Sequence, residues 1–408
     1  MTANLLYIDP GTGSMLFSIL IGALATVYFL ARAALLKLKF LFTGKKGTVD
    51  KSTHKYVIYN EDKRYWNVFK PVLDAFEKHE TEITYFTSYK EDKVFSSNYK
   101  YVISQYIGEG NAAYAKLNIL SADVVVMTTP GLDVYQLKRS KNVKHYAHLE
   151  HSVGDATMYR MFGLDYFDSV LVTGMYKEAD VRYLEEQRKI NRKEIISVGC
   201  TYLDVFKERI EQLPSEENHK FTVLLSPSWG PSAILTRYGE KLLDPLIATG
   251  WNIIIRPHPQ SKISEKEVLD NLTSKYKDKD NLFWDYESDN IYSMKKADIM
   301  ISDFSGIIYD YSFLCDKPVM YVNGDMDLRM YDAYYVPGRN PWQVNAIKKF
   351  GIELNENQFP NIKEIIQNAS DSKELADLRH AAKDEAWEHI GNAGENIYQF
   401  IINKGNNL

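Results

Sequence analysis

The chain has 408 residues, of which 45% are hydrophobic and 25% charged, and its formal net charge is −5. This is an ordinary globular composition, long enough for two or three domains that each bury a core. The acidic balance argues against a generally basic nucleic-acid binder, so an anionic ligand would need local basic groups. With only Cys200 and Cys315, the chain has no disulfide framework and no CxxC metal pair, which is typical of a reducing compartment.

An uncharged run near the N-terminus, residues 12–31 (TGSMLFSILIGALATVYFLA), predicts a membrane span. A helix of about 20 residues is about 30 Å long, the thickness of the hydrocarbon core of a bilayer. Asp9 precedes the run, and five basic residues follow it: Arg32, Lys37, Lys39, Lys45 and Lys46. The positive-inside rule then puts the N-terminus outside and the rest in the cytoplasm. We expect residues 1–46 to be a single-pass anchor in the cell membrane, the alternative being a buried core helix.

The part after the anchor alternates between predicted strands and helices. Helical stretches at 65–78 and 176–189 lie among short apolar segments that read as strands, at 55–60, 82–88, 123–130, 144–150, 169–174 and 194–199. Strands that alternate with helices predict a mostly parallel sheet with helices on both faces. Ligands of such sheets bind beyond the carboxyl ends of the strands.

A polar passage at 209–220 separates this series from a second one, with predicted strands at 221–227, 251–259, 281–285, 298–303 and 318–323. We therefore expect an N-terminal Rossmann-like domain at 50–207 for the acceptor and a C-terminal one at 220–370 for the nucleotide donor. The two domains would face a cleft, where small molecules usually bind. A last helical segment, at 372–403 within a C-terminal region of 371–408, would pack back across both domains.

Residues 297–311 (ADIMISDFSGIIYDY) place hydroxyl and carboxyl side chains where a strand gives way to a helix. Ser302, Asp303, Ser305 and Gly306 suit a phosphate site, because the start of a helix offers unpaired N–H donors and partial positive charge. The alternative is that the serines and the aspartate only cap the helix. Asp310, one turn on, is a candidate contact to a hydroxyl of the ligand or a plain helix residue.

Arg256-Pro257-His258-Pro259 follows another predicted strand. The prolines prevent the strand from continuing, so the imidazole of His258 would project at the carboxyl end of the sheet. It could donate to a phosphate oxygen or transfer a proton, and Arg256 beside it supplies a positive charge. The alternative is a loop histidine bonded to the backbone.

Three histidines three residues apart, His145, His148 and His151, follow the pattern HYAHLEH. On a strand the first two face opposite sides, so a shared metal site is disfavoured. His151 would stand in the loop after the strand, in the cleft, as a general base. We expect His145 and His148 to be packed or surface residues.

Ser226-Pro227-Ser228-Trp229-Gly230 also follows a predicted strand. The Ser228 hydroxyl and backbone N–H groups could line the phosphate site, with Trp229 as a candidate contact to the polyol or nucleotide. The alternative is an ordinary tight turn. Four separate motifs thus end four predicted strands, which favours a site over coincidence.

The chain resembles the CDP-glycerol glycerophosphotransferase family of teichoic-acid and capsule polymer synthesis. The resemblance rests on EDKRYWNVFKPVLDAF at 61–76, HYAHLEHS at 145–152, RPHP at 256–259 and ADIMISDFSGIIYDYSFLCDKPVMY at 297–321. The resemblance covers about 55–340. It implies a membrane-associated enzyme of the GT-B type that works without a bound catalytic metal or other cofactor. The two histidines of the family match His151 and His258, and its phosphate-binding hydroxyls match Ser302 and Ser305. The chain departs from the family pattern at two places. The residues after the first histidine, 152–154, differ from those of the family, and the loop at 227–230 lacks the arginine that the family has there.

We therefore expect transfer of a polyol phosphate, most simply glycerol phosphate, from a CDP-activated donor to a hydroxyl of a lipid-linked glycan or polymer. His151 and His258 would be catalytic. The donor phosphates would lie against six residues: Ser228, Arg256, Ser302, Asp303, Ser305 and Gly306. Two alternatives stay open: a nucleotide-sugar glycosyltransferase of the same architecture, and a non-catalytic, membrane-anchored binding protein.

Overall fold

The computed structural model describes Ile21, Leu24, 26–28, 30–32, 53–214, 219–324, 327–336 and 338–408. The chain divides into two compact units, Met1–Ser52 and Thr53–Leu408. In the first unit the described residues are helical and exposed. Most of the predicted anchor at 12–31 lies outside the described residues, and no helix within them is long and apolar enough to cross a membrane.

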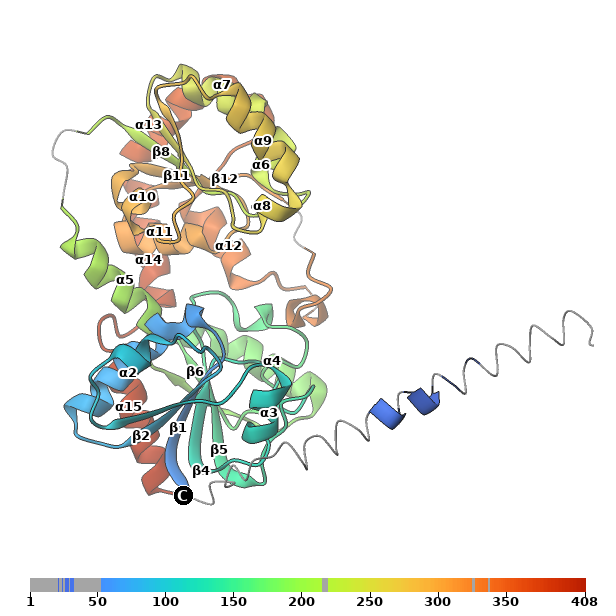
Figure 1. Cartoon of the computed structure of the whole chain (residues 1–408). Coiled ribbons are helices and arrows are strands. Elements are labelled where there is room, and N and C mark those ends of the chain that lie inside the picture. The colour runs from blue at the N-terminus through green and yellow to red at the C-terminus, as the bar shows by residue number, and fades with distance from the viewer. Residues whose placement is uncertain are drawn as a thin grey trace, which may run out of the picture. The chain divides into compact units, whose positions relative to one another are not determined.

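The first sheet of the second unit has seven strands, all parallel, in the order β3-β2-β1-β4-β5-β6-β7 (Figure 1). Its central strands are buried on both faces, which explains their continuous apolar runs. The apolar pattern of the sequence does not reveal β3, because only Val102 of this edge strand is buried. The strands are β1 (His54–Asn60), β2 (Ile83–Thr87), β3 (Val102–Tyr106), β4 (Ser121–Met127), β5 (Asn142–Leu149), β6 (Ser169–Val172) and β7 (Glu194–Ser197).

The second sheet has six parallel strands in the order β10-β9-β8-β11-β12-β13. The strands are β8 (Thr222–Leu225), β9 (Asn252–Ile255), β10 (Leu282–Trp284), β11 (Ile299–Ser302), β12 (Val319–Tyr321) and β13 (Ile352–Glu353). The expected α/β fold with parallel sheets is thereby confirmed. In both sheets the strand order reverses beside the first strand, between β1 and β4 and between β8 and β11. Such a reversal opens a crevice at the carboxyl ends of the two strands.

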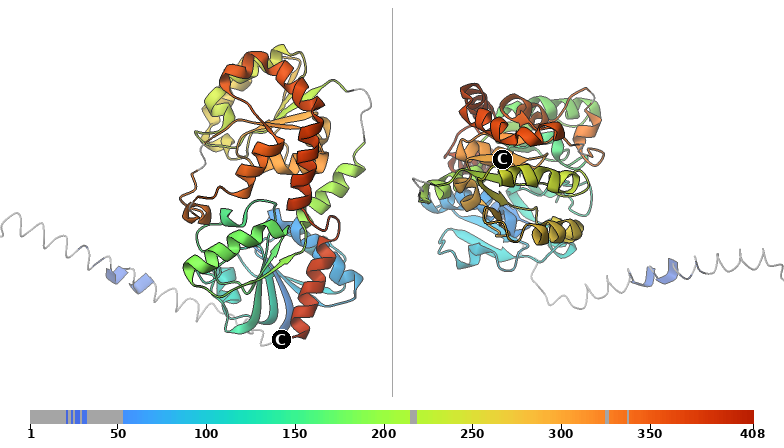
Figure 2. Two further views of the ribbon diagram at one scale, coloured as in Figure 1. Left: turned by 180° about the vertical axis from the view of Figure 1, so that it is seen from behind. Right: turned by 90° about the horizontal axis from the view of Figure 1, so that it is seen from above.

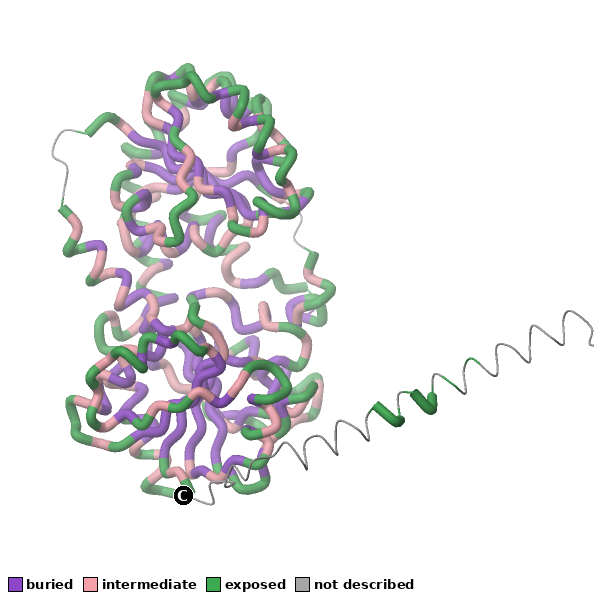
Figure 3. The backbone as a smooth tube through the Cα atoms, in the orientation of Figure 1, coloured by how far each residue is buried: buried purple, intermediate pink, exposed green. Residues whose placement is uncertain are grey.

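Helices cover both sheets, whose strands are the most buried part of the chain (Figure 3). We call β1–β7 with its helices the N-terminal lobe and β8–β13 with its helices the C-terminal lobe. The helices of the first lobe include η1 (Lys63–Tyr65), α2 (Trp66–Lys78), η2 (Lys93–Ser96), α3 (Asn111–Leu117), η3 (Ala156–Met158), η4 (Met175–Lys177), α4 (Glu178–Arg188) and α5 (Thr201–Gln212). Those of the second are α6 (Ile234–Tyr238), α7 (Glu240–Ala248), α8 (Ser261–Ser264), α9 (Lys266–Lys275), α10 (Ile291–Lys296), α11 (Ile307–Cys315), η5 (Asp332–Tyr335), α12 (Trp342–Phe350), η6 (Glu356–Asn361) and α13 (Ile362–Asp371). The domain boundaries expected from the sequence stay a prediction, since 53–408 forms one compact unit.

The C-terminal segment is two helices rather than the single helix expected at 372–403. α14 (Lys373–Ala386) contacts α11 and α12, and α15 (Ala393–Asn406) contacts α2 (Figure 2). The break contains His389 and Gly391, both with positive φ. The carboxylate of Asp204 holds the break in place, because it accepts hydrogen bonds from Trp387 Nε1 at 3.0 Å and from the Gly391 N–H at 2.8 Å.

Candidate active site

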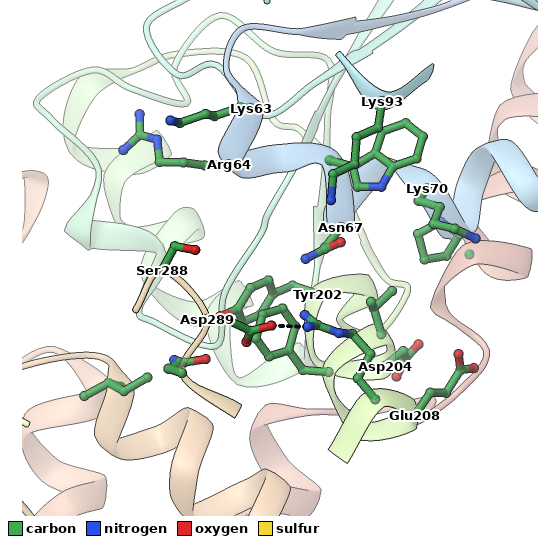
Figure 4. Close-up of a pocket in the computed structure, with 18 of the residues that line it drawn as sticks. Lys63, Arg64, Asn67, Lys70, Lys93, Tyr202, Asp204, Glu208, Ser288 and Asp289 are labelled. Atoms are coloured by element: carbon green, nitrogen blue, oxygen red, sulfur yellow. Dashed lines mark hydrogen bonds and ion pairs between the residues drawn. The ribbon is translucent and has the colours of Figure 1, made fainter. Parts of the chain in front are cut away.

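A cleft of about 1140 Å³ lies between the two lobes. Its walls come from segments that follow the carboxyl ends of the strands: after β1, β2 and β7 in the N-terminal lobe, and after β8 to β11 in the C-terminal lobe. Figure 4 shows the basic residues after β1 and β2 across from Ser288 and Asp289 after β10. Polar residues that line it include Lys63, Arg64, Asn67, Lys70, Lys93, Tyr202, Glu208, Arg209, Ser226, Arg256, His258, Ser288, Asp289, Asn290 and Ser305.

The turn after β11 presents Ser305 and the start of α11 to this cleft. Ser305 lines the cleft together with Ser226, which follows β8. Gly306 is exposed, and a Cβ added there would meet nothing within 4 Å. A helix start that is open in this way can accept an anion against its free N–H groups. The two predicted residues therefore stand at the crevice between β8 and β11.

Ser302 and Asp303 have a different position from the one expected. Ser302 is fully buried, and its Oγ donates to the Ser226 carbonyl at 2.6 Å. The Asp303 carboxylate accepts from the N–H groups of Ser228 and Ile234, both at 3.0 Å. Burial raises the pKa of Asp303. Both side chains face the protein interior and fix the loop after β8, which corrects the predicted phosphate contact to a supporting one.

Ser228 likewise is buried, and it is not among the residues that line the cleft. Its Oγ has no hydrogen-bond partner within the described part of the chain. The Trp229 side chain beside it is 49% exposed, and its ring centroid lies 6.2 Å from that of His258. Trp229 is therefore available to a ligand, whereas the predicted role of the Ser228 hydroxyl requires the loop to move.

His258 lines the cleft, and the Gln260 N–H donates to its Nδ1 at 3.1 Å. A ring nitrogen that accepts a bond carries no proton, so in the neutral ring the proton is on Nε2. Burial lowers the pKa of His258. The imidazole is thus neutral and can donate from Nε2 to an oxygen of a ligand. This arrangement favours hydrogen bonding over proton abstraction.

Arg256 also lines the cleft, but its guanidinium is largely occupied. It forms an ion pair with Asp285 and donates to the carbonyl oxygens of Glu287 at 2.7 Å and Asp289 at 3.2 Å. The carboxylate neutralises much of the charge that the sequence analysis assigned to phosphate binding. Arg256 therefore orders the segment after β10, and any contact with the donor is secondary to that.

His151 follows β5 and lies next to the cleft, though not among its lining residues. Its ring centroid is 5.0 Å from that of Tyr65, which stands between the lining residues Arg64 and Trp66. Burial, with the charges of Lys177 and Arg64, lowers the pKa of His151 to about 4. Its Nδ1 is buried without a hydrogen-bond partner among the described residues. The ring is neutral near pH 7 and can accept a proton.

The other two histidines of HYAHLEH are core residues, as expected. His148 is fully buried, with its ring edge-on to Tyr159 and Phe167. His145 bonds to Ser169 Oγ at 2.8 Å. Among the described residues no group of three or more His, Cys, Asp or Glu side chains could hold a metal ion.

Asp310 lies in the first turn of α11 beside Tyr202, and burial raises its pKa to about 7. It is not among the residues that line the cleft, whereas Tyr202 is. The predicted role of Asp310 stays a prediction.

The N-terminal lobe contributes a wall of basic residues that the sequence motifs did not indicate. Lys63 and Arg64 in η1, Lys70 in α2 and Lys93 in η2 all line the cleft (Figure 4). Arg64 pairs with Asp62 and Lys70 with Asp74, but Lys63 and Lys93 make no ion pair within the described part of the chain. Three of the four, Lys63, Arg64 and Lys70, lie in EDKRYWNVFK, a segment noted only for its resemblance. Two unpaired cations in a cleft of an acidic protein indicate an anionic ligand.

Two parallel α/β sheets whose carboxyl edges border one cleft define a GT-B-like protein. Residues 52–403 match the family described as CDP-Glycerol:Poly(glycerophosphate) glycerophosphotransferase, and the chain belongs to this family. It is a CDP-glycerol glycerophosphotransferase-like enzyme. No curated protein matches the chain significantly.

Solved structures share the fold at low sequence identity. The wall teichoic acid polymerase TagF is 16% identical with a TM-score of 0.56, over 92% of this chain and 97% of that one. A putative UDP-N-acetylglucosamine 2-epimerase from Listeria monocytogenes is 14% identical with a TM-score of 0.57, over 88% and 98%. S. aureus MnaA in a structure with UDP is 13% identical with a TM-score of 0.55, over 88% and 98%.

Proposed function

We propose that the protein transfers a polyol phosphate, with glycerol phosphate preferred, from a CDP-activated donor to a hydroxyl of a lipid-linked glycan or polymer in the synthesis of a cell-wall or capsule polymer. The observation that carries the proposal is the cleft itself. One wall presents the open start of α11 with Ser305 and His258, and the other presents unpaired lysines. The family description and a TagF structure soaked with CDPG support the choice of donor.

The donor diphosphate would lie on the C-terminal wall. Ser305 Oγ, the backbone N–H groups at the start of α11 and Nε2 of His258 would donate to its oxygens. These donors stabilise the charge that the phosphoryl oxygens carry in the transition state. The crevice between β8 and β11 is where a parallel sheet of this order binds nucleotides.

The reaction needs a base for the attacking hydroxyl. The neutral ring of His151 would take the proton as the acceptor oxygen bonds to the β-phosphorus of the donor. The bond from that phosphorus to the bridging oxygen breaks, CMP leaves with the electron pair, and the histidine later returns its proton to solvent. A positioned base of this kind contributes about 10²- to 10⁴-fold. Because His151 lies beside the cleft, closure of the lobes on the substrates would complete the site.

The acceptor would lie along the basic wall. Lys63 and Lys93 suit a phosphate-bearing acceptor, and the family description names poly(glycerophosphate). The uncharged run at 12–31 supports the proposal of a single-pass anchor with the catalytic part in the cytoplasm. An anchor raises the local concentration of a lipid-linked acceptor. Binding partners are thus the donor, the acceptor and the membrane.

The experiment that tests the proposal is nucleotide release from purified full-length protein in detergent. CDP-glycerol, CDP-ribitol and UDP-N-acetylglucosamine are each offered with a poly(glycerophosphate) acceptor lipid, and CMP or UDP is measured. The proposal expects CMP from CDP-glycerol. The epimerase neighbours give the UDP-sugar alternative a specific basis, and release or epimerisation of the UDP-sugar would establish it. Binding of none of the three by calorimetry would favour a non-catalytic binding protein.

A further inference from the structure

We propose that Lys177 is a positioning residue that holds His151 in place for proton transfer by binding the residues on either side of it. This inference rests on the proposed function, because it takes His151 as the base. Lys177 ends η4, the turn that follows β6, whereas His151 follows the neighbouring strand β5.

Two hydrogen-bonding partners of the Lys177 ammonium group flank the histidine. Its Nζ forms an ion pair with the Glu150 carboxylate and donates to the Ser152 carbonyl at 3.0 Å. The side chains of Lys177 and Glu150 are each only 1% exposed. One ammonium group therefore fixes the loop immediately before and immediately after His151.

The same turn holds the next residues of the loop. Tyr176 donates through its hydroxyl to the Val153 carbonyl at 2.5 Å. Its ring packs against Trp342 of α12, with the ring centroids 4.7 Å apart. The turn Met175–Lys177 thus anchors the backbone of the loop from within the N-terminal lobe and also contacts the C-terminal lobe.

His151 has few other means of orientation. In many sites a carboxylate accepts from the second nitrogen of a catalytic histidine, but here Nδ1 is buried with no hydrogen-bond partner in the described residues. The ring is held by the edges of Tyr65 and Tyr159, with centroids 5.0 Å and 6.5 Å away. Its position beside the cleft therefore depends on the backbone that Lys177 holds.

Stability alone does not account for this ion pair. Burying two charges costs so much desolvation energy that apolar residues of similar volume are often as good or better. The buried pair of Lys177 and Glu150 instead holds the loop that carries His151 in one position. A displacement of about 1 Å in a catalytic group can lower turnover about 100-fold.

Lys177 also acts on His151 through its charge. The charged and titratable groups that face the imidazole are Lys177, Arg64, His148, Tyr65 and Tyr159. Lys177 and Arg64 lower the pKa of His151. Loss of the lysine charge would therefore raise this pKa and move the acidic limb of the pH–rate profile to higher pH.

The test compares Lys177→Met with Lys177→Arg and with the double variant Glu150→Leu/Lys177→Met. The double variant removes both charges, so it stays informative if Lys177→Met alone fails to fold. We expect Lys177→Met and the double variant to lose about 10- to 100-fold in kcat for CMP release, with the KM for CDP-glycerol within about twofold. The acidic limb should move to higher pH, and Lys177→Arg should recover most of the rate.

Wild-type kcat in the double variant would overturn the proposal, and so would a loss of kcat with no movement of the acidic limb. A second measurement separates it from failure of the proposed function. The imidazole of His151, assigned by its absence in His151→Ala, is titrated by NMR in the wild type and in Lys177→Met without substrates. Absence of CMP release by the wild type would reject the proposed function. An unchanged His151 titration in Lys177→Met would reject the role of Lys177 whatever the substrate.

Discussion

Asp155 of the N-terminal lobe caps a helix of the C-terminal lobe: its Oδ2 accepts a hydrogen bond from the Trp342 N–H, at the first residue of α12, at 2.7 Å. Its own N–H donates to Gln343 Oε1 at 2.9 Å. Asp155 stands four residues after His151 in the loop that Lys177 holds on its other side. The loop of the proposed base is therefore tied to both lobes, which links its position to the separation of the cleft walls.

Asp155→Ala should lower the free energy of unfolding by about 1–2 kcal/mol, the usual cost of losing a helix cap. It should also lower kcat, because the loop of His151 loses one of its two hydrogen bonds to α12, the one that the Asp155 carboxylate accepts from the Trp342 N–H. Urea unfolding and the CMP-release assay measure the two effects. The matched control is Asp270→Ala, an exposed carboxylate paired with Lys266, where a loss of less than about 1 kcal/mol is expected. Equal losses in both variants would contradict the capping role.

His151→Ala should reduce CMP release by about 10²- to 10⁴-fold, while the affinity for CDP-glycerol stays close to that of the wild type. The physical reason is that this change removes the proton acceptor and leaves the donor wall intact. Steady-state kinetics and calorimetry give the two quantities. His145→Asn is the control, since this histidine lies within β5, the strand before His151, and bonds to Ser169 Oγ, which is not a cleft-lining residue. Turnover at the wild-type rate in His151→Ala would show that another group is the base.

Ser305→Ala should change donor binding, whereas Ser302→Ala should change the stability of the fold. A hydrogen bond to an ionised group contributes about 1.5–3 kcal/mol, so Ser305→Ala should weaken donor binding about 10- to 100-fold with little effect on stability. Ser302→Ala removes a buried bond to the Ser226 carbonyl and should cost about 0.5–1.5 kcal/mol of unfolding free energy. Calorimetric titration with CDP-glycerol and urea unfolding are run on both. Unchanged donor affinity in Ser305→Ala would leave this serine as a turn residue only.

Lys63→Ala combined with Lys93→Ala should raise the KM for a phosphate-bearing acceptor and leave the KM for CDP-glycerol unchanged. Both lysines are exposed on the cleft wall without ion-pair partners among the described residues, so their charge is available to an anion. The effect should shrink as salt is added, because salt screens exposed charges. Lys116→Ala, an exposed lysine of α3 outside the cleft lining, is the control. An acceptor KM that does not change would place the acceptor elsewhere.

Asp310 should make stability depend on pH. Because burial raises its folded-state pKa from 3.8 to about 7, the folded protein binds more protons than the unfolded chain between these values. The free energy of unfolding should therefore fall as the pH rises from about 4 to about 7. Asp310→Asn should remove this decline and be more stable than the wild type at pH 8, by at most about 4 kcal/mol. Urea unfolding at pH 5 and pH 8 measures it, and a decline of equal size in the variant would exclude Asp310 as its source.

The pattern of apolar residues predicted most strands of both lobes, because burial on both faces of a parallel sheet produces continuous apolar runs. It also placed Ser305 and His258 at carboxyl ends of strands, where the cleft forms. The pattern does not reveal the edge strands β3 and β13, since β3 buries only Val102 and β13 consists of two partly exposed residues. The break between the two C-terminal helices was not predicted either, because Asp204, whose carboxylate holds the break, lies 187 residues before Gly391.

The sequence by itself determined the fold class, the family and the turns in which functional groups could stand. Only the tertiary structure decided which side chains of those turns face the cleft. Ser302 and Ser305 are both serines and lie three residues apart. The Ser302 hydroxyl nevertheless faces the interior, where it donates a hydrogen bond to the carbonyl of Ser226, 76 residues away. Lys63, Lys93 and His258 line one cleft although they are far apart in the sequence. Which residues become neighbours depends on which strands pair and how the loops close, and that information is spread over the whole sequence.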